Sequence, residues 1–178
     1  MRPVRLGDGD PFATPAERRD PARRLRGRLV APVTVWTAGD LGARPAGLTV
    51  ASVLVAEGDP ARLLGLIGPT TDLAERIEQT GAFVVHVLGA ADQLLAERFA
   101  ERRPPVQPQF EGIEASPSPW GPVLAGSRPL AACRVVERRP IGTADLVEAI
   151  IEELVVGELA DPLAWQRGAY RRLDQGGG

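Results

Sequence analysis

Two hydroxyl side chains precede a predicted helix and could help to bind an anion. Thr70 and Thr71 open the segment TTDLAERIEQTG, whose capping-box spacing at Asp72 and Glu75, apolar residues four apart and final glycine predict a short helix. Backbone N–H groups at a helix N-terminus bind phosphate-like anions through hydrogen bonds and the helix dipole. Such a pair is also typical of a helix cap, and on its own it is better explained as one.

A second candidate is a run of small and hydroxyl residues within an apolar strand predicted for residues 46–56. Thr49, Val50, Ala51 and Ser52 make up this run. Small side chains on a strand let a flat ligand approach the backbone closely. The same residues would suit a strand in the protein core equally well.

The sequence gives little support for a metal site, a nucleophilic active site or a nucleotide-binding loop. His86 and Cys133 are the only histidine and cysteine, so one chain cannot form a disulfide or a Cys/His metal cluster. The sequence has no G-x-S-x-G or P-loop motif, and its G-x-G at residues 7–9 does not follow a strand. His86 lies within a predicted strand, where a hydrogen-bonded structural histidine is the simpler interpretation than a catalytic one.

Composition favours a small-molecule partner. The 21 basic residues, all arginine, are spread among 23 acidic ones, and the net charge is −2. This pattern does not indicate a basic surface for binding nucleic acid. The arginines of residues 18–28 are accompanied by Glu17 and Asp20, which favours a solvated helix start over an anion-binding arm. No apolar stretch approaches the ~18 to 20 residues of a membrane helix, and the N-terminus lacks a signal-peptide pattern. We therefore expect a cytoplasmic protein without membrane contact.

The remaining segments predict a mainly β domain at residues 23–173, between a flexible tail at 1–22 and a disordered one at 174–178. Strands are expected at 29–37, 46–56, 62–67, 82–88, 130–137 and within 162–173, and a helix at 91–100. Residues 101–129 are proline-rich and predict an extended loop anchored by Phe110 and Trp120. Many strands without βαβ alternation indicate an antiparallel barrel.

The order of these segments resembles the flavin reductase family. Its members show a T-V-S-S run, a Ser/Thr loop before a helix, a strand of the type F-x-V-N-V-L, a helix ending in F-A, a G-D-H turn and a final Y-x-x-G-x-Y. The corresponding stretches here are 49–52, 69–72, 83–88, 99–100, 142–144 and 165–170. The match covers residues from about 24 to 173.

The resemblance implies a six-stranded antiparallel FMN-binding split barrel with short flanking helices, acting as a homodimer. It implies that residues 145–159 form a strand, although their Glu, Ala and Leu content favours a helix. It also implies a flavin site with FMN, or FAD, as cofactor and NAD(P)H as co-substrate. The candidate site residues are Thr49, Val50, Ala51, Ser52, Pro69, Thr70, Thr71 and Phe99, the last flanking the ring.

Two departures bear on function. Ala144 stands where the family carries the histidine of the G-D-H turn, near the expected nicotinamide, and His86 replaces the usual asparagine. Hydride transfer to flavin needs orientation more than an acid or base, so a reductase remains the first interpretation, with a partner monooxygenase as recipient of reduced flavin. The alternatives are a non-catalytic flavin carrier or sensor, and a dimeric interaction module that has lost flavin.

Overall fold

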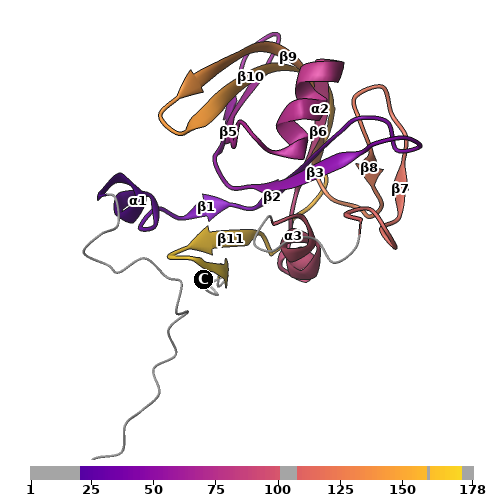
Figure 1. Cartoon of the computed structure of the whole chain (residues 1–178). Coiled ribbons are helices and arrows are strands. Elements are labelled where there is room, and N and C mark those ends of the chain that lie inside the picture. Colours follow the sequence, from indigo (N-terminus) through magenta and orange to yellow (C-terminus); the bar gives the residue numbers. More distant parts are fainter. Residues whose placement is uncertain (1–20, 101–107, 160, 174–178) are drawn as a thin grey trace, which may run out of the picture.

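A computed structural model describes residues 21–100, 108–159 and 161–173, so the predicted tails lie outside it except for residues 21–22. The fold is mainly β, as predicted (Figure 1). In chain order the elements are α1 (Pro21–Arg26), β1 (Ala31–Pro32), β2 (Thr34–Ala38), β3 (Ala46–Val50), β4 (Val53–Ala56), β5 (Arg62–Ile67), α2 (Asp72–Thr80), β6 (Ala82–Val87), η2 (Ala90–Asp92), α3 (Gln93–Phe99), β7 (Ala115–Ser116), β8 (Val123–Leu124), β9 (Leu130–Ile141), β10 (Ala144–Val155), β11 (Leu163–Gln166) and β12 (Ala169–Arg172). No helix among the described residues is long and apolar enough to cross a membrane.

One curled antiparallel sheet forms the body of the domain. Its seven strands are ordered β3-β2-β6-β9-β10-β5-β4, one more than the predicted six. The extra strand arises because the predicted strand at 46–56 breaks at Ala51 and Ser52 into β3 and β4. The Leu66 N–H donates to the Ser52 carbonyl at 3.0 Å, which closes the curl between β3 and β5.

Residues 145–159 illustrate how pairing overrides helix propensity. β10 occupies Ala144–Val155 and is hydrogen-bonded to β9 on one side and to β5 on the other. Its residues alternate between buried and half-buried positions up to Ala149. The predicted strand is therefore confirmed, because two antiparallel ladders satisfy its backbone groups.

The main core lies inside the curled sheet. Trp36 stacks on Phe83 with ring centroids 4.6 Å apart. A Cβ atom at Gly65 would lie 2.4 Å from the Trp36 ring, so a glycine is required on β5 at this point. A second core cluster contains Phe99 and joins α3 and β11 to the other side of β2. In Figure 1, β2 and β3 run between α2 and α3.

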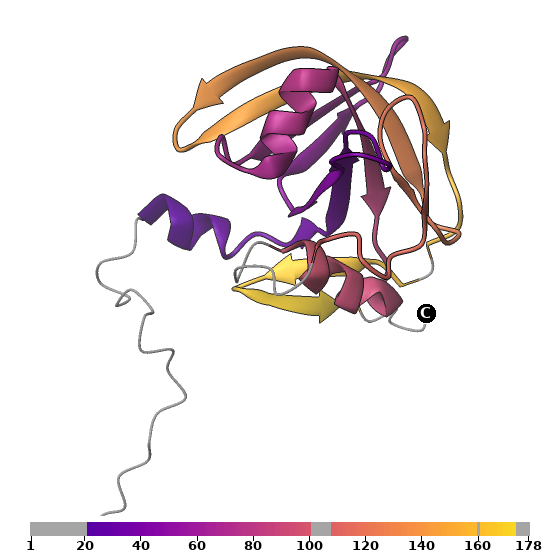
Figure 2. The ribbon, with the colours of Figure 1, turned by 45° about the vertical axis from the view of Figure 1, so that its right-hand side comes forward.

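The C-terminal segment 162–173 is a hairpin rather than the single strand predicted. Arg167 and Gly168 take positive φ values of 51° and 80° at its turn, and β11 pairs with β1. Figure 2 shows this hairpin beneath the curled sheet, beside α3. A sequence pattern cannot distinguish one irregular strand from two short strands when the turn carries only one glycine.

In the described part of the long loop, residues 108–129, both predicted anchors contact the rest of the domain. The prediction of an extended loop is wrong for β7 and β8, which pair as a two-stranded antiparallel sheet. Phe110 packs edge-on against Phe99, with ring centroids 5.3 Å apart. The Trp120 Nε1–H donates to Glu152 at 2.5 Å, and this carboxylate also accepts a hydrogen bond from Arg134. These two hydrogen bonds hold the Glu152 pKa below its usual value.

Candidate flavin site

The break between β3 and β4 presents backbone and one hydroxyl at the edge of the sheet. The Thr49 hydroxyl donates to the Ala96 carbonyl at 2.6 Å, which ties β3 to α3. The buried Val50 offers its carbonyl to the Thr34 hydroxyl at 2.6 Å. The half-buried Ser52 hydroxyl has no hydrogen-bond partner among the described residues. Of the hydroxyls in this run, that of Ser52 is the one available to a ligand.

The start of α2 is the second part of the site. Thr71 is the N-cap: its hydroxyl accepts from the Ala74 N–H at 3.1 Å and donates to the Gly68 carbonyl at 2.9 Å. The cap is therefore Thr71 and not the predicted Asp72/Glu75 box. Pro69 and Thr70 are exposed just before it. The Thr70 hydroxyl and the N–H groups of Asp72 and Leu73 remain as anion donors, because the first N–H groups of a helix have no partner within it.

One feature of α2 opposes an anion at this place. Asp72 is the first residue of the helix and is exposed. Its carboxylate stabilises the helix dipole but repels a phosphate dianion bound to the same turn.

The two parts lie together because β5 connects them. The Ser52 carbonyl bonds to Leu66 near the end of β5, and Thr70 follows that strand by three residues. The sheet register thus brings together residues 49–52 and 69–71, which are separated by about twenty residues in the sequence.

The turn that matches G-D-H lies beside the same segment. Asp145 pairs with Ile67, so Ala144 lies next to Gly68 and the start of α2. Arg138 fixes this arrangement: it forms an ion pair with the buried Asp145 at 2.7 Å and donates to the Ala74 carbonyl of α2 at 2.9 Å. Sequence reasoning missed both charged residues, since one arginine and one aspartate on a strand carry no distinguishing signal.

Phe99 is fully buried. A Cβ atom at Gly47 would lie 2.4 Å from its ring, and Phe110 covers another side. Packing in the core accounts for all of these contacts, and a contact of Phe99 with flavin stays a prediction.

His86 is a structural histidine in this fold. Its buried ring contacts the Val35 carbonyl through Nδ1 at 3.1 Å, and its Nε2 accepts the Leu124 N–H at 3.1 Å. Burial, opposed by the Val35 hydrogen bond and reinforced by the charge of Arg128, lowers its pKa from 6.5 to about 4. The neutral ring therefore holds β8 against β2 and β6.

Cys133 does not supply a nucleophile. Its side chain is fully buried on β9, and burial raises the pKa of its thiol to about 12. A thiolate is the reactive form of cysteine, and it is negligible here at neutral pH.

The curled antiparallel sheet with its few short helices defines a mainly β domain. A family model described as "Flavin reductase like domain" matches residues 26–174, so the chain belongs to this family. It is 35% identical over 154 residues to the NADH-dependent FMN reductase AsuE2 of Streptomyces nodosus subsp. asukaensis, covering 85% of this chain and 83% of that protein. It is 31% identical over 157 residues to the FMN reductase (NADH) RutF 2 of Methylorubrum extorquens, covering 85% and 87%.

Solved structures agree with this assignment. Nitrilotriacetate monooxygenase component B from Mycobacterium thermoresistibile matches with a TM-score of 0.76 and 28% identity, over 86% of this chain and 85% of that one. BorF, the flavin reductase component of a bacterial two-component tryptophan halogenase, matches with a TM-score of 0.74 and 25% identity, over 85% and 98%.

Proposed function

We propose that this protein is an NADH-dependent FMN reductase whose flavin lies along the break between β3 and β4, with its phosphate at the start of α2. The observation that carries this assignment is the meeting of residues 49–52 and 69–71 at one edge of the sheet. The Ser52 hydroxyl, which has no partner among the described residues, and the exposed Thr70 lie there beside the first N–H groups of α2. FAD, which contains the FMN unit, and NADPH are the variations to test.

Bound FMN supplies the hydride-accepting chemistry, so the chain's own residues bind and orient. The backbone of Thr49 to Ser52 provides a narrow surface for a flat ring, because its small side chains allow close approach. The hydroxyls of Ser52 and Thr70 and the first turn of α2 donate hydrogen bonds to phosphate oxygens. Arg138 holds α2 against the hairpin that carries Ala144 and so fixes the distance between the phosphate and nicotinamide sides.

The reduced flavin is proposed to serve a partner oxygenase. BorF and nitrilotriacetate monooxygenase component B are, by their names, components of such systems. The proposed reaction takes place in the bacterial cytoplasm, where NADH is available. The proposed active form is a homodimer, which accords with the apolar side chains that the single chain leaves exposed.

One observation favours a second candidate, a flavin-binding protein without turnover. Ala144 leaves the expected nicotinamide side without the imidazole of the G-D-H turn. Such a protein would hold flavin as a carrier or sensor.

Visible absorbance of the purified protein with added FMN, followed by NADH oxidation, separates the candidates. A flavin spectrum with NADH oxidation supports the reductase. A flavin spectrum without oxidation of NADH or NADPH leaves the carrier, and a protein that FMN cannot colour leaves only an interaction module that has lost flavin.

A further inference from the structure

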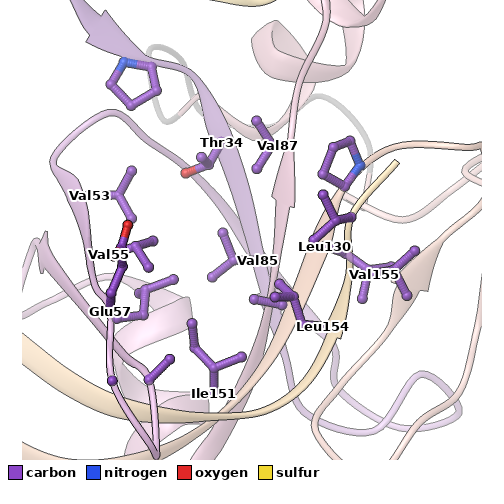
Figure 3. Close-up of a pocket in the computed structure, with 17 residues that line it drawn as sticks. Thr34, Val53, Val55, Glu57, Val85, Val87, Leu130, Ile151, Leu154 and Val155 are labelled. Carbon is purple, nitrogen blue, oxygen red and sulfur yellow. The ribbon is translucent and has the colours of Figure 1, made fainter. Parts of the chain in front are cut away.

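The mouth of the curled sheet contains an apolar hollow that does not suit a dinucleotide. The hollow has a volume of about 550 Å³ and lies between β4 on one side and the ends of β9 and β10 on the other (Figure 3). Of its 17 lining residues Glu57 is the only charged one, and the Thr34 hydroxyl already donates to the Val50 carbonyl. A pyrophosphate needs cationic or N–H donors, which these side chains do not supply. The turn at 142–144 therefore remains the expected side for the nicotinamide.

Arg138 on β9 connects this turn to the start of α2. Its Nε and Nη2 contact Oδ2 of Asp145 at 2.8 and 2.7 Å, and its Nη1 donates to the Ala74 carbonyl at 2.9 Å. Glu78, one helical turn further along α2, lies 3.5 Å from the same Nη1. Asp145 is buried and directly follows Ala144 of the turn. One guanidinium thus bonds both to the hairpin of β9 and β10 and to the helix that carries the proposed phosphate site.

The start of α2 has few other directional contacts with this hairpin. At the far end of the helix, the Val135 N–H of β9 donates to the Gly81 carbonyl at 2.9 Å. Leu73 and Ile77 are buried in the core, but apolar contacts are non-directional. Among the described residues, no side chain other than Arg138 hydrogen-bonds α2 to the hairpin. The orientation of the first turn of α2 relative to the 142–144 turn therefore depends on this guanidinium.

Stability alone does not account for the pair of Arg138 and Asp145. Their side chains are only 20% and 12% exposed, so both charges are largely removed from water. The cost of desolvation offsets much of the attraction in such a pair, and apolar residues of similar volume often give equal or greater stability. Apolar residues cannot, however, supply hydrogen bonds of fixed direction to two elements at once, as the planar guanidinium does. The pair therefore suits a role in geometry.

We propose that Arg138 is a positioning residue that couples the two substrates, so that occupation of the phosphate site on α2 raises the affinity for the dinucleotide. This inference rests on the proposed function and goes beyond a fixed spacing of the two sides. The first turn of α2 loses freedom when it holds the phosphate, and Arg138 transmits this restraint to Asp145 and the hairpin. The hairpin then has less freedom left to lose when the dinucleotide docks. Because coupling is reciprocal, the dinucleotide must tighten FMN by the same factor.

NADH oxidation measured with saturating FMN and with saturating riboflavin tests the coupling, because riboflavin lacks the phosphate. In wild type the KM for NADH should be about fivefold to tenfold lower with FMN than with riboflavin, within the usual range of coupling. Isothermal titration with NAD⁺, which cannot reduce the flavin, should give the same ratio of dissociation constants. This second measurement does not depend on turnover.

Arg138→Lys is the main variant. Lysine keeps a positive charge beside Asp145, but its single ammonium cannot reproduce the fork that also reaches the Ala74 carbonyl. The variant should make the NADH KM values with FMN and riboflavin equal, with kcat for riboflavin nearly unchanged. If it does not fold, the double variant Arg138→Met with Asp145→Leu removes the bridge without leaving a buried charge unpaired, and the same equality is expected.

Arg62→Lys is the matched control. Arg62 pairs with Glu148 at 2.6 Å between β5 and β10, so the same chemical change is made in the same sheet. Neither residue has a hydrogen bond to α2 among the described residues. The control should keep the wild-type ratio between the two flavins, and circular dichroism melts of each variant check folding.

Three results would contradict the inference. Equal NADH KM values with the two flavins in wild type would show that the sites are not coupled, and the reductase proposal would stand. A ratio that persists in Arg138→Lys, even if both KM values rise together, would mean that Arg138 has a structural role only. Absence of NADH oxidation with either flavin would overturn the proposed function itself, and this inference with it.

Discussion

Acidification should destabilise the fold through His86. The buried ring has a pKa of about 4 in the folded chain against 6.5 ordinarily, so the unfolded chain binds more protons between these two values. The contribution of His86 to the free energy of unfolding is therefore complete above pH 6.5 and is lost as the pH falls toward 4. Below pH 4 the ring is protonated in both the folded and the unfolded chain, so His86 lowers stability no further. The lowering corresponds to about 3 kcal/mol in total, most of which is already lost at pH 4.5.

The assay is urea unfolding of wild type and His86→Asn at several pH values from 7.5 to 4.5. Asparagine is the family's usual residue here and does not titrate. The variant loses a hydrogen bond that His86 makes with Val35 or Leu124, and this loss lowers the free energy of unfolding by about 1 to 3 kcal/mol at every pH. Carboxylates such as Glu152 also lose their interactions in acid, but they do so in both proteins and cancel in the difference.

The stability advantage of wild type over His86→Asn should thus shrink by about 2 to 3 kcal/mol between pH 7.5 and 4.5. Parallel curves for the two proteins would show that His86 is not held neutral by burial, and the reasoning would fail.

Three further predictions concern the proposed flavin site. Ser52→Ala and Thr70→Ala should each weaken FMN by about 1 to 3 kcal/mol while riboflavin, which lacks the phosphate, is hardly affected; equal losses in isothermal titration would place the phosphate elsewhere. Asp72→Asn should tighten FMN severalfold by removing a like charge from the first turn of α2, and an unchanged affinity would mean that the phosphate does not approach this turn. Ala144→His should raise kcat/KM for NADH roughly tenfold to a hundredfold with FMN affinity nearly constant, and identical kinetics would show that the dinucleotide docks away from the 142–144 turn.

The sequence by itself determined the elements that local chemistry specifies. The helix at α2 follows from a hydroxyl cap, apolar spacing and Gly81, whose φ of 65° a glycine adopts without strain. The strand at β5 was predicted with its observed bounds, since its apolar run is short and lies between turn residues. The family resemblance added the strand at residues 145–159, and the site segments at 49–52 and 69–71 stay a prediction.

Tertiary structure decided what depends on residues far apart in the chain. β10 is a strand because β9 and β5 pair with it, against its own helix propensity. The partners of His86 lie 51 and 38 residues away, so no local pattern could show that its ring is neutral and bonded on both nitrogens. The hollow at the mouth likewise exists only because the curl brings β4 opposite the ends of β9 and β10, an arrangement set by long-range pairing and packing that a one-dimensional pattern does not encode.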